Sequence, residues 1–472
     1  AGVQEGIPVV PAVIDLTTLQ PNTDIADDLE AAILQAGTAG GGAILLGSGT
    51  FDISRTIVLD QDGVVIRGQG QGQTILRYTH SISAGEIRQI SPEPGDPAIG
   101  DQWLEWHVYP GSLTTGDRVS KIELFNQGGT NLIETETQDT SKSSRDGQFT
   151  IGYYAGYSTI TNGSDQYRVK VTRENGTTQE QTFTIQVNRS TKLPDKKRRV
   201  PRAHDSAFVM TGDEWTARYD VWQLTQDTLR GTRTFTVDTD VTSETIPLEV
   251  GDLIFVDTPT TAAFRALVGE TISNNRVPRR CYYRVEAISG DGKTLTIDEP
   301  VRIDYEASEG TEIKAIYFIR GSGIEELTIE QPNMLWTHGI MMRFAMNCWI
   351  RNVTVTKAGR NPFDLTDSKW CEIRDSAADE VWYNGGGGTG YIDANNAHDC
   401  LVDGIETTDL RHVPCTQWGS QGSVFRNMQA ISSDPHLHSG WVVENLLENV
   451  VSDGTRGTGA YGYGLFSELD TS

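Results

Sequence analysis

The sequence predicts an all-β protein: a parallel β-helix with an N-terminal capping helix and an inserted antiparallel, sandwich-like β module. The chain has 472 residues, of which 49 are glycine, and short apolar runs alternate with turn residues. Its last third repeats a short β motif every 22 to 29 residues without any helical pattern between the copies. A block in the first half instead has longer alternating strands, which are typical of hairpins.

Residues 24–35, "DIADDLEAAILQ", have the clearest helical pattern in the chain. Either Thr23 or Asp24 can cap the start of this helix. Its expected apolar stripe consists of Ile25, Leu29, Ala32 and Ile33. We expect the helix to cover one open end of the β-helix, where strand edges would otherwise be exposed.

Residues 101–192 are predicted to be a separate unit inserted into the β-helix. They contain long alternating strands such as "DQYRVKVT" and "QTFTIQVN", and "NGS" and "ENGT" have the composition of hairpin turns. The chain therefore divides into a cap with the first β-helix turns (1–100), the antiparallel module (101–192) and the main parallel β-helix with its groove (193–472).

A basic stretch, "DKKRRVPR" at residues 195–202, follows the inserted module on an otherwise acidic chain. Such a run is either a solvated linker or a local patch that binds anions. We expect the module and this stretch to form one wall of a substrate groove, from which Arg202 and His204 reach the substrate.

The repeat begins at residues 348, 371, 400, 423 and 445, with the motifs "CWIRNV", "CEIRDS", "CLVDGI", "SVFRNM" and "NLLENV". In a parallel β-helix, equivalent residues of successive turns stack about 4.8 Å apart. The motifs would thus form an interior ladder of small residues: Cys348, Cys371, Cys400 and Ser423. Buried thiols at these positions are favoured over metal or redox sites.

The repeat also sets the register of the strand that precedes each motif. Residues at the same distance before the motif in successive turns should stack, and we call each such set a column. The columns eight and six residues before the motif are mostly apolar or small, so they should face the core; Cys415, Gln417 and Leu437 belong to them. The columns between should face outward. One outer face would then carry Arg343, Asp364, Tyr391, Asp393, Trp418, His436 and His438, with Arg360, Arg411 and His412 at the entering turn.

Three segments resemble the pectate-lyase-like superfamily of right-handed parallel β-helices: "DIADDLEAAILQAGTAGGGAILLGSGTFDIS", "VVIRGQGQGQTILRY" and "CWIRNVTVTKAG". The resemblance covers about residues 1–80 and 230–472. The superfamily includes lyases, hydrolases, epimerases and phage spikes. Residues 411–450 are similar to secreted polysaccharide lyases, in particular fucoidan (fucoglucuronomannan) lyases. The calcium site of pectate lyases has no residue-by-residue match here.

The first functional hypothesis is β-elimination on a polysaccharide that contains uronic acid. A cation such as Arg343 or Arg360 would neutralise the uronate carboxylate. Tyr391 and His438 would form the acid and base pair, with His436 assisting. Tyr391 and His436 are expected in one column with Pro414 between them, roughly 9–10 Å apart at about 4.8 Å per turn. Asp364, Asp393, Arg411, His412 and Trp418 would bind the substrate.

Two alternatives remain open at this point. Glycoside hydrolysis needs two carboxyl groups, and Asp364 and Asp393 are expected on adjacent turns about 5 Å apart, with Asp367 as a possible third. A module that binds glycan without cleaving it would use the aromatic Trp418 and the basic stretch only to hold the chain. Reaction products separate the two enzyme hypotheses.

Asp434, His436 and His438 alternate along the chain in "SSDPHLHSGW" and could bind a transition metal. However, Pro435 disturbs the alternation, and catalysis is favoured over metal binding. No metal or cofactor is expected to be required, although calcium remains possible.

The net charge of −25 argues against a general nucleic-acid-binding protein, and no apolar run is long enough to span a membrane. Five cysteines are too few for a disulfide framework. We expect an acidic polysaccharide as the partner, a secreted or periplasmic location and possibly a homo-oligomer.

Overall fold

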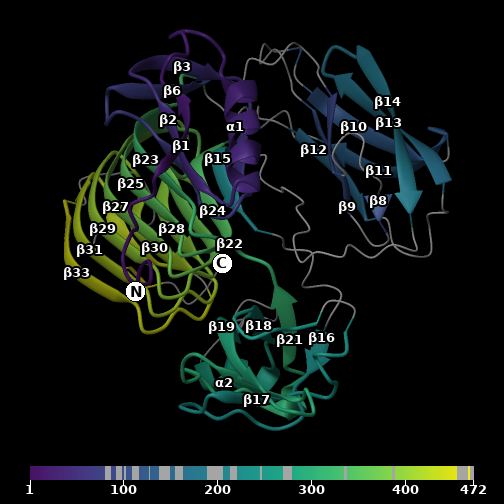
Figure 1. The fold of residues 1–472 in the computed structure, drawn as a ribbon, viewed down its shortest axis with the longest axis vertical. Helices are drawn as coiled ribbons and strands as arrows, with labels where there is room; N and C mark the ends of the chain where they lie inside the picture. The colour runs from purple at the N-terminus through teal and green to yellow at the C-terminus, as the bar shows by residue number, and fades with distance from the viewer. Residues whose placement is uncertain are drawn as a thin grey trace.

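The computed structural model describes most of the chain (Figure 1). The described residues are 1–79, 87–91, 98–99, 103–108, 116–117, 119–126, 128–137, 149–154, 163–188, 206–212, 221–244, 247–268, 279–333, 337–384, 388–438, 440–453 and 466–467. Arg202 and His204 lie outside these ranges, as does the basic stretch 195–202.

The predicted parallel β-helix is confirmed, and two long parallel sheets run the length of the stack (Figure 1). The first sheet consists of β1 (Ala12–Leu16), β2 (Gly42–Leu46), β5 (Val64–Arg67), β23 (Gly323–Glu330), β25 (Trp349–Ala358), β27 (Glu372–Val381), β29 (Leu401–Thr408), β31 (Val424–Ile431) and β33 (Leu446–Ser452), joined at one end by β3 (Gly49–Ile53) and β6 (Thr74–Tyr78). The second consists of β4 (Ile57–Leu59), β15 (Ser206–Thr211), β24 (His338–Met346), β26 (Phe363–Lys369), β28 (Tyr391–Asn395), β30 (His412–Gln417), β32 (Asp434–Leu437) and β34 (Phe466–Ser467), with β22 (Ile319–Arg320) beside β24.

The core between these sheets contains the predicted ladder of small residues. Cys348, Cys371 and Cys400 are fully buried in it, and the Ser423 hydroxyl accepts a hydrogen bond from the Cys400 amide at 3.2 Å. All five cysteines are free thiols. Cys348, Cys371 and Cys400 serve as small apolar residues of the core, as the repeat predicted.

The repeat motif encodes a bend as well as an interior residue. Its fifth residue has positive φ in every turn: Asn352, Asp375, Gly404, Asn427 and Asn449, with φ between 50° and 68°. The strand pairing skips these residues and resumes on both sides of them. Asparagine, aspartate and glycine tolerate this left-handed conformation better than other residues. A side chain also links one bend to the neighbouring turn, because Asn427 Nδ2 donates to Asp403 Oδ1, beside the bend at Gly404, at 2.8 Å.

The capping helix is confirmed as α1 (Ala26–Thr38), which begins two residues after the predicted start. The predicted stripe residues Ile25, Leu29, Ala32 and Ile33 are all buried in the β-helix core. The Asp24 carboxylate accepts hydrogen bonds from the amides of Ala26 and Ser54, so it joins the helix start to the next turn. Within the described ranges, no helix is long and apolar enough to cross a membrane.

The inserted module is a pair of small sheets that share one core, as predicted, and it begins before residue 101. One sheet contains β10 (Val119–Asn126), β11 (Asn131–Thr137), β13 (Gly163–Arg173), β14 (Thr178–Asn188) and β8 (Ala98–Ile99); the other contains β7 (Ile87–Ser91), β9 (Trp103–Val108) and β12 (Phe149–Tyr154). Trp106 of β9 packs on Tyr167 of β13 with ring centroids 5.5 Å apart, so the two sheets form a sandwich.

Residues 221–316 differ from the prediction, which assigned them to the parallel β-helix. They form a second antiparallel module with its own core (Figure 1). Its elements are β16 (Val221–Gln223), β17 (Thr234–Thr236), β18 (Leu253–Thr258), α2 (Ala262–Val268), β19 (Arg279–Ile288), β20 (Thr294–Ile297), η2 (Ala307–Glu309) and β21 (Glu312–Ile316). Short β runs alone do not distinguish parallel from antiparallel pairing, because that choice depends on contacts distant in sequence.

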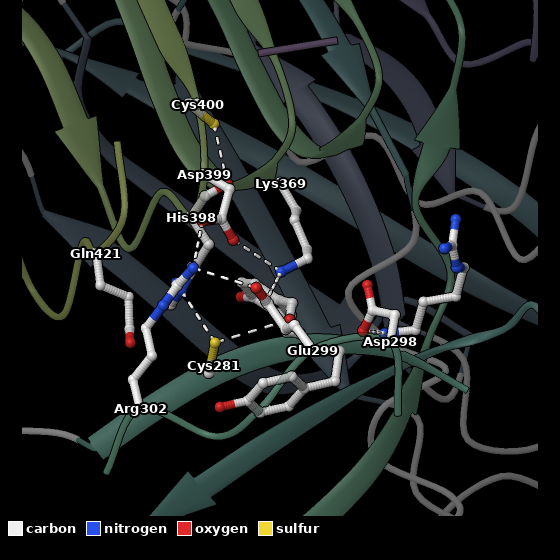
Figure 2. Close-up of polar contacts among 12 residues, drawn as sticks. Cys281, Asp298, Glu299, Arg302, Lys369, His398, Asp399, Cys400 and Gln421 are labelled. Atoms are coloured by element: carbon white, nitrogen blue, oxygen red, sulfur yellow. Dashed lines mark hydrogen bonds and ion pairs between the residues drawn. The ribbon is translucent and has the colours of Figure 1, made fainter. Parts of the chain in front are cut away.

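A buried ionic cluster joins this second module to the β-helix (Figure 2). Lys369, at the end of β26, is fully buried, and its Nζ donates to Glu299 at 2.5 Å and to Asp399 at 3.0 Å. Arg302 of the module also binds the carboxylates of Asp399 and Glu299. Burial alone would lower the pKa of the Lys369 ammonium, but the adjacent Asp399 carboxylate raises it above its usual value.

The bend in the repeat can be tested at Asn427. We expect Asn427→Val to unfold at a lower urea concentration than Asn427→Gly, by about 1–2 kcal/mol, because a β-branched residue is strained at positive φ. Both variants lose the hydrogen bond to Asp403, so their difference isolates the backbone conformation. Equal unfolding midpoints would contradict this interpretation.

The ionic cluster can be tested at Lys369. Lys369→Met leaves two buried carboxylates without their ammonium partner, and we expect a loss of about 3–5 kcal/mol of stability. Lys357→Met is the matched control, because Lys357 pairs with Glu380 on the surface at 3.4 Å and such pairs contribute little. Urea unfolding measures the stability of both variants. A loss in Lys369→Met as small as that in Lys357→Met would show that the buried cluster does not stabilise the fold.

Candidate functional site

The candidate site lies on the outer face of the sheet β24–β26–β28–β30–β32, at its C-terminal turns. Asp364 of β26 pairs in register with Asp393 of β28, so the two predicted carboxyl groups do occupy adjacent turns. Ile340, Phe363 and Ile392, in the alternate column, are buried in the core as predicted. The face is more enclosed than predicted, because each of the two aspartates is only 4% exposed.

Three polar side chains surround the Asp364 carboxyl group. Asn361 Nδ2 donates to Asp364 Oδ2 at 3.1 Å, and the Thr366 hydroxyl donates to Oδ1 at 2.5 Å. The His338 ring lies on the same carboxyl group, with Nδ1 3.4 Å from Oδ2. This carboxylate is therefore held by three side chains.

Asp393 has fewer such partners and a different protonation behaviour. Gln417 Nε2 donates to its two carboxyl oxygens at 3.0 and 2.8 Å. Burial, and then the charge of Asp364, raise the pKa of Asp393 well above its usual value. The Arg360 guanidinium acts in the opposite direction but does not cancel the effect. The environment thus favours the neutral form of Asp393, which could donate a proton or a hydrogen bond.

The register of β30 differs from the prediction by two residues at Tyr391 and by one residue from Asp393 onward. Tyr391 pairs with His412, whereas Asp393 pairs with Cys415 and Ala394 with Thr416. The prediction that Cys415 and Gln417 face the core and Thr416 faces outward was therefore wrong. An irregularity between His412 and Cys415 causes the shift, and it recurs in the pairing of β30 with β32.

The shift places an imidazole where a proline was expected. His412, not Pro414, lies between Tyr391 and the last turn, and its ring centroid is 5.0 Å from that of Tyr391. His436 follows at 4.3 Å from His412, and His438 at 4.9 Å from His436. These four residues form one continuous row of rings, which we call the imidazole row. Leu437 pairs with Thr416 and not with Cys415 as predicted, and it is half-buried.

The members of the imidazole row have different environments. His412 Nδ1 is hydrogen-bonded to Asp434 Oδ1, which fixes the orientation of the ring. His436 is buried, and burial together with His412 and His438 lowers its pKa to about 3. Its neutral form is therefore favoured near pH 7. His438 is half-buried at the end of the row.

The predicted arginines are distributed over several turns. Arg411 Nη1 donates to the Tyr391 hydroxyl at 3.4 Å, and its guanidinium lies 5.9 Å from the centre of the Tyr391 ring. Arg360 Nη2 donates to the Gly388 carbonyl at 3.3 Å and is close enough to influence Asp393. Arg343 pairs in register with Thr366 on β24 and lies near the Phe344 ring, two strands away from Tyr391. Arg411 is thus the cation nearest to the imidazole row.

Trp418 does not lie on the strand face that was predicted for it. It follows the end of β30 in a turn, half-buried and with φ of 55°. The one-residue shift in β30 moves it from the position equivalent to Asn395 to the one equivalent to Asn396, which also has positive φ. It is not available as a flat platform on the sheet.

Four residues of the site were not assigned these roles from sequence: His338, Asn361, Gln417 and Asp434. Asp434 was noticed only as a possible metal ligand, whereas the structure shows it bound to His412. Across the residues that the structure describes, no group of three His, Cys, Asp or Glu side chains is arranged to hold a metal ion. The Asp434, His436 and His438 spacing therefore does not form such a group.

A second chemical arrangement lies in the buried cluster of Figure 2. Cys281 Sγ is 3.3 Å from His398 Nδ1, and His398 Nε2 is 3.0 Å from Asn396 Oδ1. Nucleophilic cysteines use a similar order of groups, but they need an accessible thiolate. Here burial raises the pKa of Cys281 to about 12 and lowers that of His398 well below its usual value. This arrangement is structural.

The neutral state of Asp393 can be tested through the pH dependence of stability. The pKa of Asp393 in the folded state lies above the unfolded value of 3.8. The stability that its protonated form contributes to the folded state is therefore fully present below pH 3.8. It is lost as the pH rises through the folded pKa. We expect Asp393→Asn to become progressively more stable than the wild type as the pH rises from 4 to 8. The control is Asp379→Asn, because Asp379 is exposed. A stability difference between Asp393→Asn and the wild type that does not change with pH would contradict the assignment.

No protein-family model and no curated protein matches this chain. Among solved structures it is similar to the tailspike protein gp49 from Pseudomonas phage LKA1, with 14% identity and a TM-score of 0.46 over 89% of this chain and 51% of that one. It is also similar to the Pseudomonas phage phi297 tailspike gp61 (11% identity, TM-score 0.43, 88% and 51% covered).

A third similar structure is the Gp54 tailspike of Acinetobacter baumannii bacteriophage AP22, in complex with A. baumannii capsular saccharide. The identity is 9% and the TM-score 0.43, over 92% of this chain and 50% of that one. The chain thus spans about half the length of each of the three tailspikes.

Proposed function

We propose that this chain cleaves a uronic-acid-containing polysaccharide by β-elimination at the imidazole row. The observation that carries the proposal is the placement of Tyr391, whose phenol contacts the Arg411 guanidinium and whose ring lies against His412. A phenol, an imidazole and a cation are thereby brought together from two adjacent turns.

The reaction has three chemical requirements that this arrangement can meet. The C5 proton of a uronate is weakly acidic, so the adjacent carboxylate must first be neutralised by a cation or by strong donors. A base then removes the C5 proton, and the electron pair forms the C4–C5 double bond as the C4–O bond breaks. The leaving oxygen is protonated by an acid.

Arg411 is suited to the neutralising role. A guanidinium can form two parallel hydrogen bonds to a carboxylate, and this geometry also favours the ionised form of an adjacent phenol. The neutral Asp393 carboxyl group contributes by not repelling a uronate. A pair of ionised aspartates at this position would oppose binding of the substrate.

Tyr391 and His412 are suited to the acid and base roles. They lie on neighbouring turns with ring centroids 5.0 Å apart, and Asp434 holds the His412 ring in one orientation. In this proposal His412 takes the place that was predicted for His438, because the His412 ring lies directly against Tyr391 and the rings of His436 and His438 follow further along the row. His438, the half-buried end of the row, would contact the substrate from the solvent side.

Glycoside hydrolysis is the second candidate, and one observation favours it. Asp364 and Asp393 lie on adjacent turns, and the raised pKa of Asp393 suits a general acid beside a second carboxyl group. The two reactions make different demands on Asp393. Hydrolysis needs its acidic proton, whereas β-elimination needs only a neutral hydrogen-bonding group.

The proposal is tested with a panel of acidic polysaccharides. β-Elimination yields an unsaturated uronate that absorbs ultraviolet light, whereas hydrolysis yields reducing ends without this absorbance. We expect Tyr391→Phe to lower kcat by about 10²–10⁴, the usual contribution of a proton-transfer group, with an unchanged fold by circular dichroism. Tyr305→Phe is the matched control, because Tyr305 is a buried phenol of the second module.

Asp393→Asn separates the two candidates in the same assay. Under β-elimination the amide remains a neutral donor, so we expect activity within about tenfold of the wild type. A loss of about 10²–10⁴ together with reducing ends that do not absorb would overturn the lyase proposal in favour of hydrolysis.

A further inference from the structure

A cavity of about 490 Å³ lies where the second antiparallel module meets the last turns of the β-helix. Its lining residues come mainly from the module, between Arg230 and Glu309, and Trp441 of the β-helix closes it. Cavities of about 300–1,000 Å³ are the usual size of small-ligand sites. None of its lining residues belongs to the imidazole row or to the aspartate pair.

Two aromatic side chains form one wall of this cavity. Phe264 of α2 and Trp441 meet edge to face, with ring centroids 5.6 Å apart and planes at 89°. The Arg279 guanidinium lies over the Phe264 ring at 4.3 Å and fixes it from the other side. Trp441 is half-buried, so part of its indole ring remains exposed.

The polar groups of the cavity are arginines that already have carboxylate partners. Arg279 binds Glu309, and Arg230 Nη2 is 3.3 Å from the Glu444 carboxylate. Arg302 enters from the ionic cluster, where it is bound to Asp399. Because each cation is paired, the cavity presents alternating donors and acceptors rather than a net positive charge.

This combination indicates a class of ligand. A sugar hydroxyl can accept from a guanidinium and donate to its carboxylate partner at once, so it fits between paired charges without breaking them. A uronate would place a further carboxylate beside those already present, which is unfavourable. The apolar face of a pyranose ring can pack on the indole, as apolar surface does on aromatic rings.

We propose that this cavity binds a neutral pyranose residue and is a second saccharide site, separate from the reacting face. Arg230, which lines the cavity, has an exposed guanidinium that a ligand hydroxyl can reach. The site holds sugar whichever reaction the imidazole row performs.

The two sites are close enough to engage one saccharide chain. Trp441 follows His438 by three residues, which span at most about 10 Å when fully extended. A neutral residue held in the cavity would therefore be presented near the exposed end of the imidazole row. The polysaccharide that fits both sites contains neutral sugars as well as uronates.

The test is calorimetric titration with neutral tetrasaccharides of glucose, galactose or mannose, and with glucuronic acid beside glucose as the charged comparison. We expect at least one neutral tetrasaccharide to bind and to change the tryptophan fluorescence. Trp441→Ala should weaken this binding about tenfold or more, whereas Trp441→Phe should retain most of it. Trp382→Ala, a half-buried tryptophan elsewhere on the β-helix, should bind as the wild type does.

Arg230→Ala provides a second measurement if Trp441→Ala fails to fold, because the Arg230 side chain is 71% exposed and its loss should not disturb the core. We expect weaker binding of the same tetrasaccharide. Absence of binding by every neutral saccharide, equal affinity in Trp441→Ala and the wild type, or tighter binding of glucuronic acid than of glucose would overturn the proposal. Tyr391→Phe should retain this binding, so failure of the proposed elimination remains distinguishable from failure of the cavity site.

Discussion

The structure depends on a left-handed residue placed inside each long strand of the β-helix. Asn352, Asp375, Gly404, Asn427 and Asn449 bend the chain at the same point in successive turns, and the parallel pairing continues on both sides of the bend. Most residues resist this conformation by about 1–2 kcal/mol, so its recurrence sets the register of the whole stack. Because the bends lie at the same point of successive turns, side chains far apart in sequence align in columns on the outer face.

The candidate site arises where one strand departs from that regularity. A one-residue irregularity in β30 brings His412 beside Tyr391 and turns Gln417 toward Asp393. The same face thereby acquires a neutral carboxyl group, a row of imidazoles and a phenol in contact with a guanidinium. Enclosure strengthens these interactions, because charges and dipoles act over longer range in a medium of low dielectric constant.

Charge burial has a different role at the junction with the second module. Lys369, Asp399, Glu299 and Arg302 are mutually paired, and their geometry is typical of a structural network. Arg302 belongs to this network and also to the cavity closed by Trp441. The network that attaches the module thus also shapes the proposed saccharide site.

Local sequence patterns were enough to predict the architecture, the capping helix, the first antiparallel module, the cysteine ladder and the pairing of Asp364 with Asp393, because periodic apolar residues mark the buried positions. The second module at residues 221–316 and the register of β30 were decided only by tertiary structure. Antiparallel pairing and a single-residue irregularity depend on contacts between distant strands, and a shift of one residue reverses the face of every side chain that follows. For that reason Gln417 and Trp418 were misplaced, and the residue beside Tyr391 is His412, while His436 aligns with Cys415 and Asp393.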